Sequence, residues 1–196
     1  MTYTAIELDG SVHTVGGNIE ASDALLTDTR PALDDEAFKA AMRVLAAGVV
    51  MVTSRRDGRP WGLTISSCCS LTLEPPQMLV SLGSATVSCR SILEQRRFGI
   101  SILGARQKEL AQLGAAVGVV KFVDDYCDGD EQLDSPMIAG ALYHLDCSVA
   151  DSYPVGDHTL IIGRVRQAVY RPLPKREETS PLVYFNRAFW SLGERL

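Results

Sequence analysis

The sequence predicts a mainly β protein, an antiparallel β-barrel with a few helices. Short apolar runs recur between turns that contain glycine or proline, and only a few segments have helical spacing. Strands also do not alternate with helices as they do in a doubly wound parallel sheet. The 196 residues, 46% of them apolar, are enough for one well-filled core and too few for two ordinary catalytic domains.

Two regions of the chain differ in pattern. Residues 1–33 combine glycine, aspartate and threonine without sustained periodicity, so we expect a flexible or partner-draped N-terminal arm. Residues 34–196 carry the regular patterns and form the expected barrel domain. This domain contains no internal repeat or low-complexity tract.

The expected elements of this domain begin with a helix. Three acidic residues at 34–36 precede apolar residues at three- and four-residue spacing up to Leu45, which predicts an amphipathic helix with acids at its positively polarised end. Residues 56–60 predict a turn, and the prolines in 74–76 break a ladder because proline cannot donate a hydrogen bond. Residues 119–137 form a long polar connection of the kind that often carries function. Strands are predicted at 49–53, 61–67, 78–82, 98–103, 143–150, 159–170 and 182–185, and helices at 88–94 and 105–115.

Composition and charge exclude several classes of function. A net charge of −5 gives no basic field, so binding to nucleic acid is not expected. No apolar run approaches the roughly 18 to 20 residues of a membrane-spanning helix, and the first residues lack the pattern of a secretory signal, so we expect a cytoplasmic protein without membrane contact. The five cysteines are odd in number and lack zinc-ligand spacing, which predicts neither a disulfide framework nor a metal site.

Common enzyme motifs are absent from the sequence. It contains no Gly-x-Gly-x-x-Gly fingerprint, no phosphate loop ending in Gly-Lys-Ser/Thr, no His-Glu-x-x-His and no Gly-x-Ser-x-Gly. Any bound nucleotide is therefore expected to be held by another kind of fold.

Two segments are rich in small hydroxyl-bearing residues. Residues 64–70 would let a planar ligand approach the backbone, and their hydroxyls could donate to the carbonyls and ring nitrogens of a flavin. Residues 83–88 precede a predicted helix, whose N-terminus suits a phosphate. An ordinary strand in the first segment and a simple N-cap in the second are structural alternatives that remain open.

Among His13, His144 and His158, only the last has a suggestive setting. His158 follows Asp157 in a turn before a long predicted strand, and a turn lets a side chain project into a cleft. Capping of the turn by the imidazole is the structural alternative. A hydrolytic set of Asp157, His158 and Ser66 is disfavoured because the sequence has no nucleophile elbow.

The order of segments resembles the flavin reductase-like, FMN-binding split-barrel family, which includes short-chain reductases of two-component monooxygenases. The resemblance covers roughly residues 36–190. It is carried by segments in family order at 38–47, 48–53 (GVVMVT), 57–64 (DGRPWGLT), 70–76 (SLTLEPP), 97–103 (RFGISIL), 107–110, 121–122 (KF), 156–159 (GDHT) and 181–185 (PLVYF).

The resemblance implies an antiparallel split barrel that forms a homodimer, with flavin bound near the interface and the nicotinamide stacked against its ring. Ser84 and Thr86 would reach the flavin phosphate, and the Asp157-His158 pair would lie near the nicotinamide. Around the isoalloxazine, the resemblance places Thr64, Ser66, Ser67 and Cys68 along the ring, Lys121 and Phe122 beside it, and Tyr184 and Phe185 as a wall.

The implied function is reduction of FMN or FAD with NADH or NADPH, and supply of the reduced flavin to a separate monooxygenase. Hydride transfer between the two rings needs no ionising side chain, so the implied catalytic role of His158 is to position the dinucleotide. A flavin-binding electron carrier, or another FMN-dependent oxidase on the same barrel, is the alternative. Ser66 and Cys68 stand where the family often has asparagine and phenylalanine, which leaves the hydrogen bonding and packing over the ring open. Ala85 stands where the family often has a polar or basic residue, which leaves FMN versus FAD open.

Overall fold

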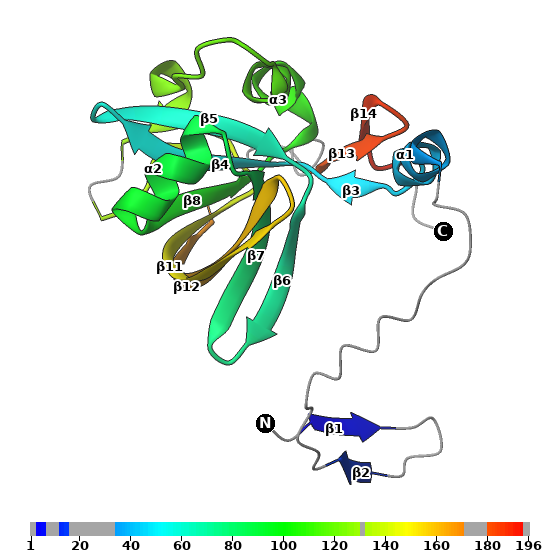
Figure 1. The fold of residues 1–196 in the computed structure, drawn as a ribbon. Helices are drawn as coiled ribbons and strands as arrows, with labels where there is room; N and C mark the ends of the chain where they lie inside the picture. The colour runs from blue at the N-terminus through cyan, green and yellow to red at the C-terminus, as the bar shows by residue number, and fades with distance from the viewer. Residues whose placement is uncertain (1–2, 7–11, 16–33, 130–131, 171–179, 194–196) are drawn as a thin grey trace. The chain divides into compact units, whose positions relative to one another are not determined.

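The computed structural model describes residues 3–6, 12–15, 34–129, 132–170 and 180–193 (Figure 1). The chain divides into two compact units, Met1–Asp35 and Glu36–Leu196. In the first unit, β1 (Tyr3–Ile6) and β2 (Val12–Val15) pair as an antiparallel hairpin, which the sequence pattern did not predict. The rest of the expected N-terminal arm lies outside the described residues, and its contact with a partner stays a prediction.

Seven antiparallel strands of the second unit form one sheet, in the order β5-β4-β8-β11-β12-β7-β6. The predicted turn at 56–60 is the hairpin between β4 and β5, and the prolines of 74–76 lie at the hairpin between β6 and β7. The strands are β4 (Val50–Arg56), β5 (Arg59–Ile65), β6 (Cys68–Leu73), β7 (Pro76–Gly83), β8 (Arg97–Ile102), β11 (Tyr143–Val155) and β12 (His158–Val169).

The two edge strands of this sheet, β5 and β6, are consecutive in the sequence. Only Ser66 and Ser67 separate the end of β5 from the start of β6. The sheet must therefore coil until its edges meet at this corner, although no ladder joins β5 to β6 among the described residues. The result is an incompletely closed antiparallel barrel, which confirms the predicted split-barrel fold class.

Apolar residues on the two faces of the coiled sheet form two cores. Alternate side chains of a strand point to opposite faces, so Val52 and Met51 of β4 enter different cores. Val52 packs inside the barrel with Ile100, where α2 (Val87–Gln95) covers the core. Met51 packs on the other face, which α3 (Lys108–Ala115) covers.

A second, smaller sheet lies next to α1 (Figure 1). The backbone N–H of Asn186 in this sheet's hairpin donates to the carbonyl oxygen of Arg43 at the end of α1, at 2.7 Å. None of the residues of α1 is buried, and, like the other described helices, α1 is not long and apolar enough to cross a membrane. The elements of this part are α1 (Asp35–Arg43), β3 (Ala47–Gly48), β13 (Leu182–Phe185) and β14 (Ala188–Ser191).

The predicted polar connection at 119–137 contains more structure than expected, because β9 and β10 pair within it. Most other predicted elements agree with the structure within a few residues. The strands β6 and β14 were missed because they are edge strands whose residues are mixed in polarity and mostly exposed or half-buried. The short elements not yet given are η1 (Ala105–Gln107), η2 (Asp124–Tyr126), β9 (Cys127–Asp128) and β10 (Met137–Ile138).

Candidate functional site

Two cavities adjoin along β5, and we refer to them together as the trough. The β13 cavity, about 370 Å³, is lined by Thr64 and Ser66 on one side and by Tyr184 of β13 on the other. The α2 cavity, about 580 Å³, lies between the start of α2 and the segment that follows α3. Ala115 and Ala116 line both cavities, so the two adjoin at the end of α3.

The last turn of α3 lies close to β5 because residue 114 is glycine. A β-carbon at Gly114 would lie 2.3 Å from Thr64 Oγ1 and 2.9 Å from Thr64 N, closer than such atoms can approach. Gly114 therefore lets the helix pack directly on the strand, and this packing places Ala115 and Ala116 where the cavities meet.

The start of α2 forms a polar end of the α2 cavity. Thr86 caps the helix as the sequence allowed, since its Oγ1 accepts from Cys89 N at 3.2 Å and donates to Gly83 O at 2.7 Å. Ser88 also lines the cavity; it is 1% exposed, and its Oγ has no hydrogen-bond partner among the residues that the structure describes. A buried hydroxyl left unpaired costs about 1–3 kcal/mol, so Ser88 fits a bound acceptor such as phosphate at this helix N-terminus.

Lys121 adds positive charge to the α2 cavity. Its Nζ donates to the carbonyl oxygen of Gly114 at 2.7 Å, and burial lowers the pKa of the ammonium. Phe122 is not among the lining residues: its ring meets Trp61 edge-on with centroids 5.1 Å apart, and the guanidinium carbon of Arg59 lies 4.0 Å from its centroid. Since Trp61 does line the cavity, Phe122 supports the wall from behind.

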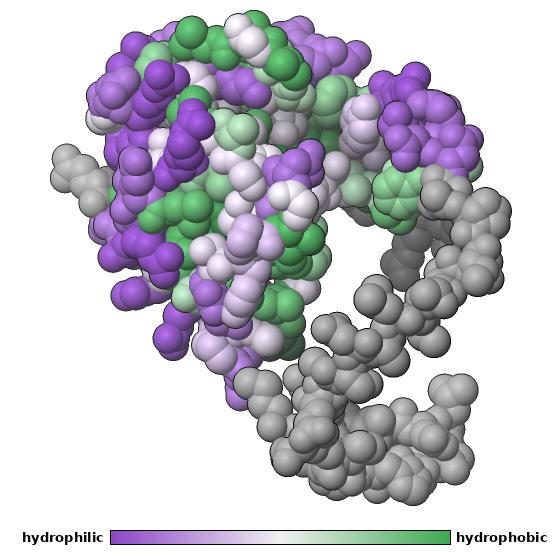
Figure 2. Space-filling model, viewed as in Figure 1, coloured by the Kyte–Doolittle hydropathy of each residue, from purple (hydrophilic) through white to green (hydrophobic). Residues whose placement is uncertain are grey.

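The segment after α3 gives the α2 cavity an apolar wall. Val117, Val119 and Val120 line it and are exposed, the first of them almost completely. Figure 2 shows apolar surface beside α3 on this side of the molecule. Exposed apolar surface next to a cavity is typical of places where a ring system or a partner docks.

Residues predicted to contact phosphate and nicotinamide come together next to the start of α2. His158 pairs with Gly83 across β12 and β7, and Ser84 N donates to Asp157 O at 2.9 Å. The Oγ of Ser84 lies 2.9 Å from Oγ1 of Thr159. His158 Nδ1 lies 2.7 Å from Asp157 Oδ1, and this hydrogen bond lowers the pKa of the Asp157 carboxyl.

Seven predicted site residues are not among the lining residues of the two cavities: Ser67, Cys68, Ser84, Phe122, Asp157, His158 and Phe185. Ser67 Oγ donates to Ser81 O at 2.8 Å, and Cys68 packs against the barrel core, where burial raises the pKa of its thiol to about 12. Phe185 meets Trp190 edge-on, with centroids 6.3 Å apart. Their contacts with a ligand stay predictions.

Four polar residues that line the cavities were not predicted from the sequence: Arg56, Ser88, Gln112 and Arg187. Ser88 belongs to the hydroxyl-rich segment 83–88, so a signal was present, but only the structure reveals that its hydroxyl is unpaired. Arg187 lines the β13 cavity from the hairpin between β13 and β14, and no sequence motif marks it.

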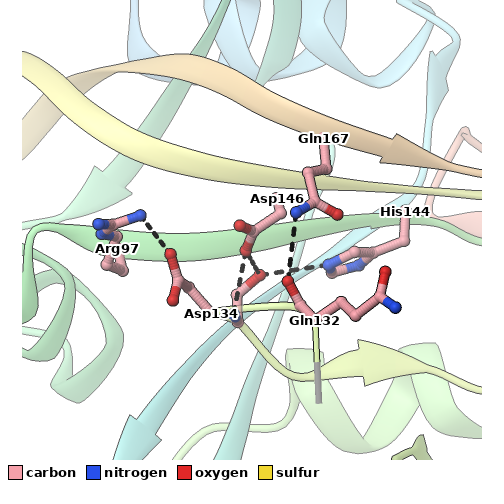
Figure 3. Close-up of polar contacts among 7 residues, drawn as sticks. Arg97, Gln132, Asp134, His144, Asp146 and Gln167 are labelled. Atoms are coloured by element: carbon pink, nitrogen blue, oxygen red, sulfur yellow. Dashed lines mark hydrogen bonds and ion pairs between the residues drawn. The ribbon is translucent and has the colours of Figure 1, made fainter. Parts of the chain in front are cut away.

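A buried polar network connects β8 and β11 to the segment 132–138 (Figure 3). His144 is 1% exposed, with Nδ1 2.9 Å from Ser101 Oγ and Nε2 3.2 Å from Ser135 Oγ. Both the backbone N–H and the hydroxyl of Ser135 donate to Asp146 Oδ1, the former at 3.0 Å. None of these four side chains lines the two cavities, so the network has a structural role.

The trough of this split barrel combines hydroxyl groups, an aromatic wall and a helix N-terminus. These features suit the ring and the phosphate of a flavin nucleotide, so the protein is of the flavin-binding split-barrel class. Residues 42–193 match the family model described as flavin reductase like domain, which is more than half of the chain. The chain belongs to this family, and the resemblance stated from the sequence is confirmed.

Relatives agree with this assignment in sequence and in structure. The chain is 33% identical over 177 residues to a flavin reductase (NADH) of Kitasatospora aureofaciens, covering 87% of this chain and 90% of that one. It is 34% identical over 157 residues to the reductase component of 4-nitrophenol 4-monooxygenase/4-nitrocatechol 2-monooxygenase of Rhodococcus opacus, covering 80% of each. An NADH:FAD oxidoreductase of Streptomyces globisporus C-1027, solved in complex with NAD and FAD fragments, matches with a TM-score of 0.71 at 28% identity, over 84% of this chain and 98% of that one.

Proposed function

We propose that this chain reduces FMN or FAD with NADH or NADPH and supplies the reduced flavin to a separate monooxygenase. The observation that carries the proposal is the trough along β5, which joins a hydroxyl-lined cavity with an aromatic wall to the unpaired hydroxyl at the start of α2. The names of the relatives support the same reaction and the same kind of partner.

The proposal assigns the isoalloxazine ring to the β13 cavity. Hydroxyls of Thr64 and Ser66 can donate to its carbonyls and ring nitrogens, and Tyr184 provides an aromatic wall. Phe189 extends this wall, since its ring centroid lies 5.4 Å from that of Tyr184. The cavity volume falls within the roughly 300–1,000 Å³ typical of small-molecule sites.

The flavin phosphate is assigned to the start of α2. Ser84, Thr86 and Ser88 bring hydroxyls there, and the helix dipole favours a negative charge. Lys121, which donates to the end of α3, adds positive charge along the way from the ring to the phosphate.

The chemistry that the cofactors supply is transfer of a hydride from C4 of the nicotinamide to N5 of the flavin. The protein's part is to bind and align the two rings, because a stacked pair at short distance needs no further acid or base. His158, held by Asp157 at the start of β12, is assigned to orient the dinucleotide.

Homodimerisation is part of the proposal, and α1 supports it. Phe38, Met42 and Leu45 follow helical spacing, yet they are 53%, 46% and 64% exposed in the single chain. An apolar face of this kind is stabilised when a second copy covers it. Because the reaction consumes NADH or NADPH, we also propose a cytoplasmic location.

The test is oxidation of NADH and of NADPH by the purified protein, with and without added FMN, FAD or riboflavin. Oxidation that depends on added flavin is expected and would identify both cofactors. Tight flavin binding without oxidation of either dinucleotide would instead support a flavin carrier or an oxidase on the same barrel.

A further inference from the structure

The trough continues beyond the β13 cavity into a third cavity. This α1 cavity, about 420 Å³, lies between α1 and the hairpin that joins β13 to β14. It shares Tyr184 and Arg187 with the β13 cavity, so the two adjoin there. Its lining residues are Phe38, Lys39, Met42, Arg43, Tyr184 and Arg187. Phe38 and Met42 also belong to the apolar face proposed for the dimer, so in the dimer this cavity lies at the edge of that contact.

Arg187 has a backbone conformation that favours glycine. Phe185 pairs with Ala188, so Asn186 and Arg187 form a two-residue turn, with φ of 47° and 62°. Positive φ at both positions is the type I′ turn, which prefers Asn-Gly or Asp-Gly. The same protein uses Asp57-Gly58, also with positive φ, for the hairpin between β4 and β5.

A second arginine with positive φ, Arg96, has a structural role that explains its conformation. Arg96, with φ of 57°, ends α2, and its guanidinium donates to Val149 O at 3.0 Å. Arg187 has no comparable bond: its side chain is exposed, and it makes no hydrogen bond or ion pair with the other residues that the structure describes. A strained residue without a structural partner, lying on the wall of two cavities, indicates a functional side chain.

The α1 cavity also carries excess positive charge. Lys39 and Arg43 both pair with Glu36, at 3.0 and 3.6 Å, so this carboxylate opposes three cations once Arg187 is included. The bond from Asn186 N to Arg43 O fixes the end of α1 against the strained hairpin. The arrangement favours an anion between the helix and the turn.

We propose that Arg187, with Lys39 and Arg43, binds a phosphate group of a nucleotide whose ring lies in the β13 cavity. A guanidinium presents planar paired donors that match phosphate oxygens. The start of α2 already offers one phosphate site, and the α1 cavity offers a second at the opposite end of the trough. The inference rests on the proposed flavin reductase function. The phosphate can come from the nicotinamide dinucleotide or from the flavin nucleotide, and in the second case the α1 cavity replaces the start of α2 as the site of the flavin phosphate.

The test is Arg187→Gly, which restores the preferred Asn-Gly turn and so is not expected to lower Tm. Apparent KM is measured for FMN, FAD, riboflavin, NADH and NADPH at low salt. Loss of a charge-assisted contact predicts about a tenfold rise in KM for at least one phosphate-bearing nucleotide. This rise is expected to exceed any change in KM for riboflavin, which has no phosphate, and high salt should reduce the difference.

The arms of the experiment separate the two sources of phosphate. A rise confined to NADH and NADPH assigns the phosphate to the dinucleotide, and a rise for FMN or FAD assigns it to the flavin. Unchanged KM for every nucleotide, or an equal rise for riboflavin, would overturn the proposal. Arg166→Gln, which removes one exposed charge on β12 away from the cavities, is the matched control.

A direct measurement of nucleotide binding tests the phosphate site independently of the proposed reductase activity. If the wild-type protein oxidises neither dinucleotide with any flavin, the proposed function fails. Calorimetric titration of wild type and Arg187→Gly with FMN, FAD and NADH then still tests the phosphate site: about tenfold weaker binding to the variant supports it, and equal binding overturns it.

Discussion

The Ser88 hydroxyl is expected to lower the stability of the ligand-free protein and to strengthen flavin binding, and one substitution tests both effects. This hydroxyl is buried without a partner in the described part of the chain, so Ser88→Ala should stabilise the ligand-free protein by about 1 kcal/mol, which raises Tm by roughly 2–4 °C in a chain of this size. The same change should raise apparent KM for FMN several-fold and leave KM for riboflavin unchanged. Thermal unfolding and steady-state kinetics check both results.

The control for this prediction lies in the same helix. Ser91 is also buried in α2, but it does not line the α2 cavity, so Ser91→Ala should leave KM for FMN unchanged. A Tm for Ser88→Ala below that of the wild type would show that the hydroxyl is satisfied in solution and does not await a ligand.

His158 should act through binding alone. Because the hydride passes directly between two rings, His158→Ala should mainly raise apparent KM for NADH or NADPH while turnover persists at saturating dinucleotide. Steady-state kinetics over a wide range of dinucleotide concentration measure the two effects separately. Complete loss of turnover at saturation would contradict a positioning role.

Asp157 offers a second readout of the same contact. The hydrogen bond from His158 lowers the pKa of the Asp157 carboxyl, so the bond stabilises the folded state above the ordinary pKa of an aspartate. That contribution is lost as the pH falls through the lowered pKa. In His158→Ala the pKa of Asp157 should therefore move up towards its ordinary value, as followed by NMR titration of the carboxyl carbon. An unchanged value would show that the bond does not persist in solution.

At the scale of elements, α1 was correctly predicted as a helix, but its packing was not predicted. The acids at 34–36 and the helical spacing correctly indicated a helix, but none of its residues is buried in this chain. Periodicity reports that a face is apolar and does not report what covers it. The same limit applies to the edge strands. β14 has no alternating pattern, and the leucines that alternate with Ser70 and Thr72 in β6 are exposed, so they mark no buried face.

The proposed dimer contact of α1 can be tested outside the α1 cavity. Leu45 is 64% exposed and does not line that cavity, so Leu45→Asp should weaken the dimer without direct loss of a nucleotide contact. Light scattering over a dilution series is expected to show dissociation at a higher protein concentration than for the wild type. Leu73→Asp, in the hairpin of β6 and β7, is the comparison; dissociation by Leu73→Asp alone would place the contact there instead.

At the scale of the whole molecule, the sequence predicted local patterns better than their assembly. The hydroxyl-rich segments 64–70 and 83–88 were identified from composition, and the structure brings both to one trough. The end of α3 and the strained Arg187 were not identified, because a close approach to Gly114 and a positive φ depend on contacts between distant parts of the chain. Strand order was accessible only through the family resemblance.

The corner formed by Ser66 and Ser67 also limits how far the edge strands β5 and β6 can separate. Three extended residue steps span at most about 11 Å, so the ends of β5 and β6 near Ile65 and Cys68 are tethered to each other. The far ends of these strands, near Arg59 and Leu73, have no such tether. Opening of the barrel is therefore a hinged motion about the corner, and the wall of the trough that carries Ser66 lies at its stationary end.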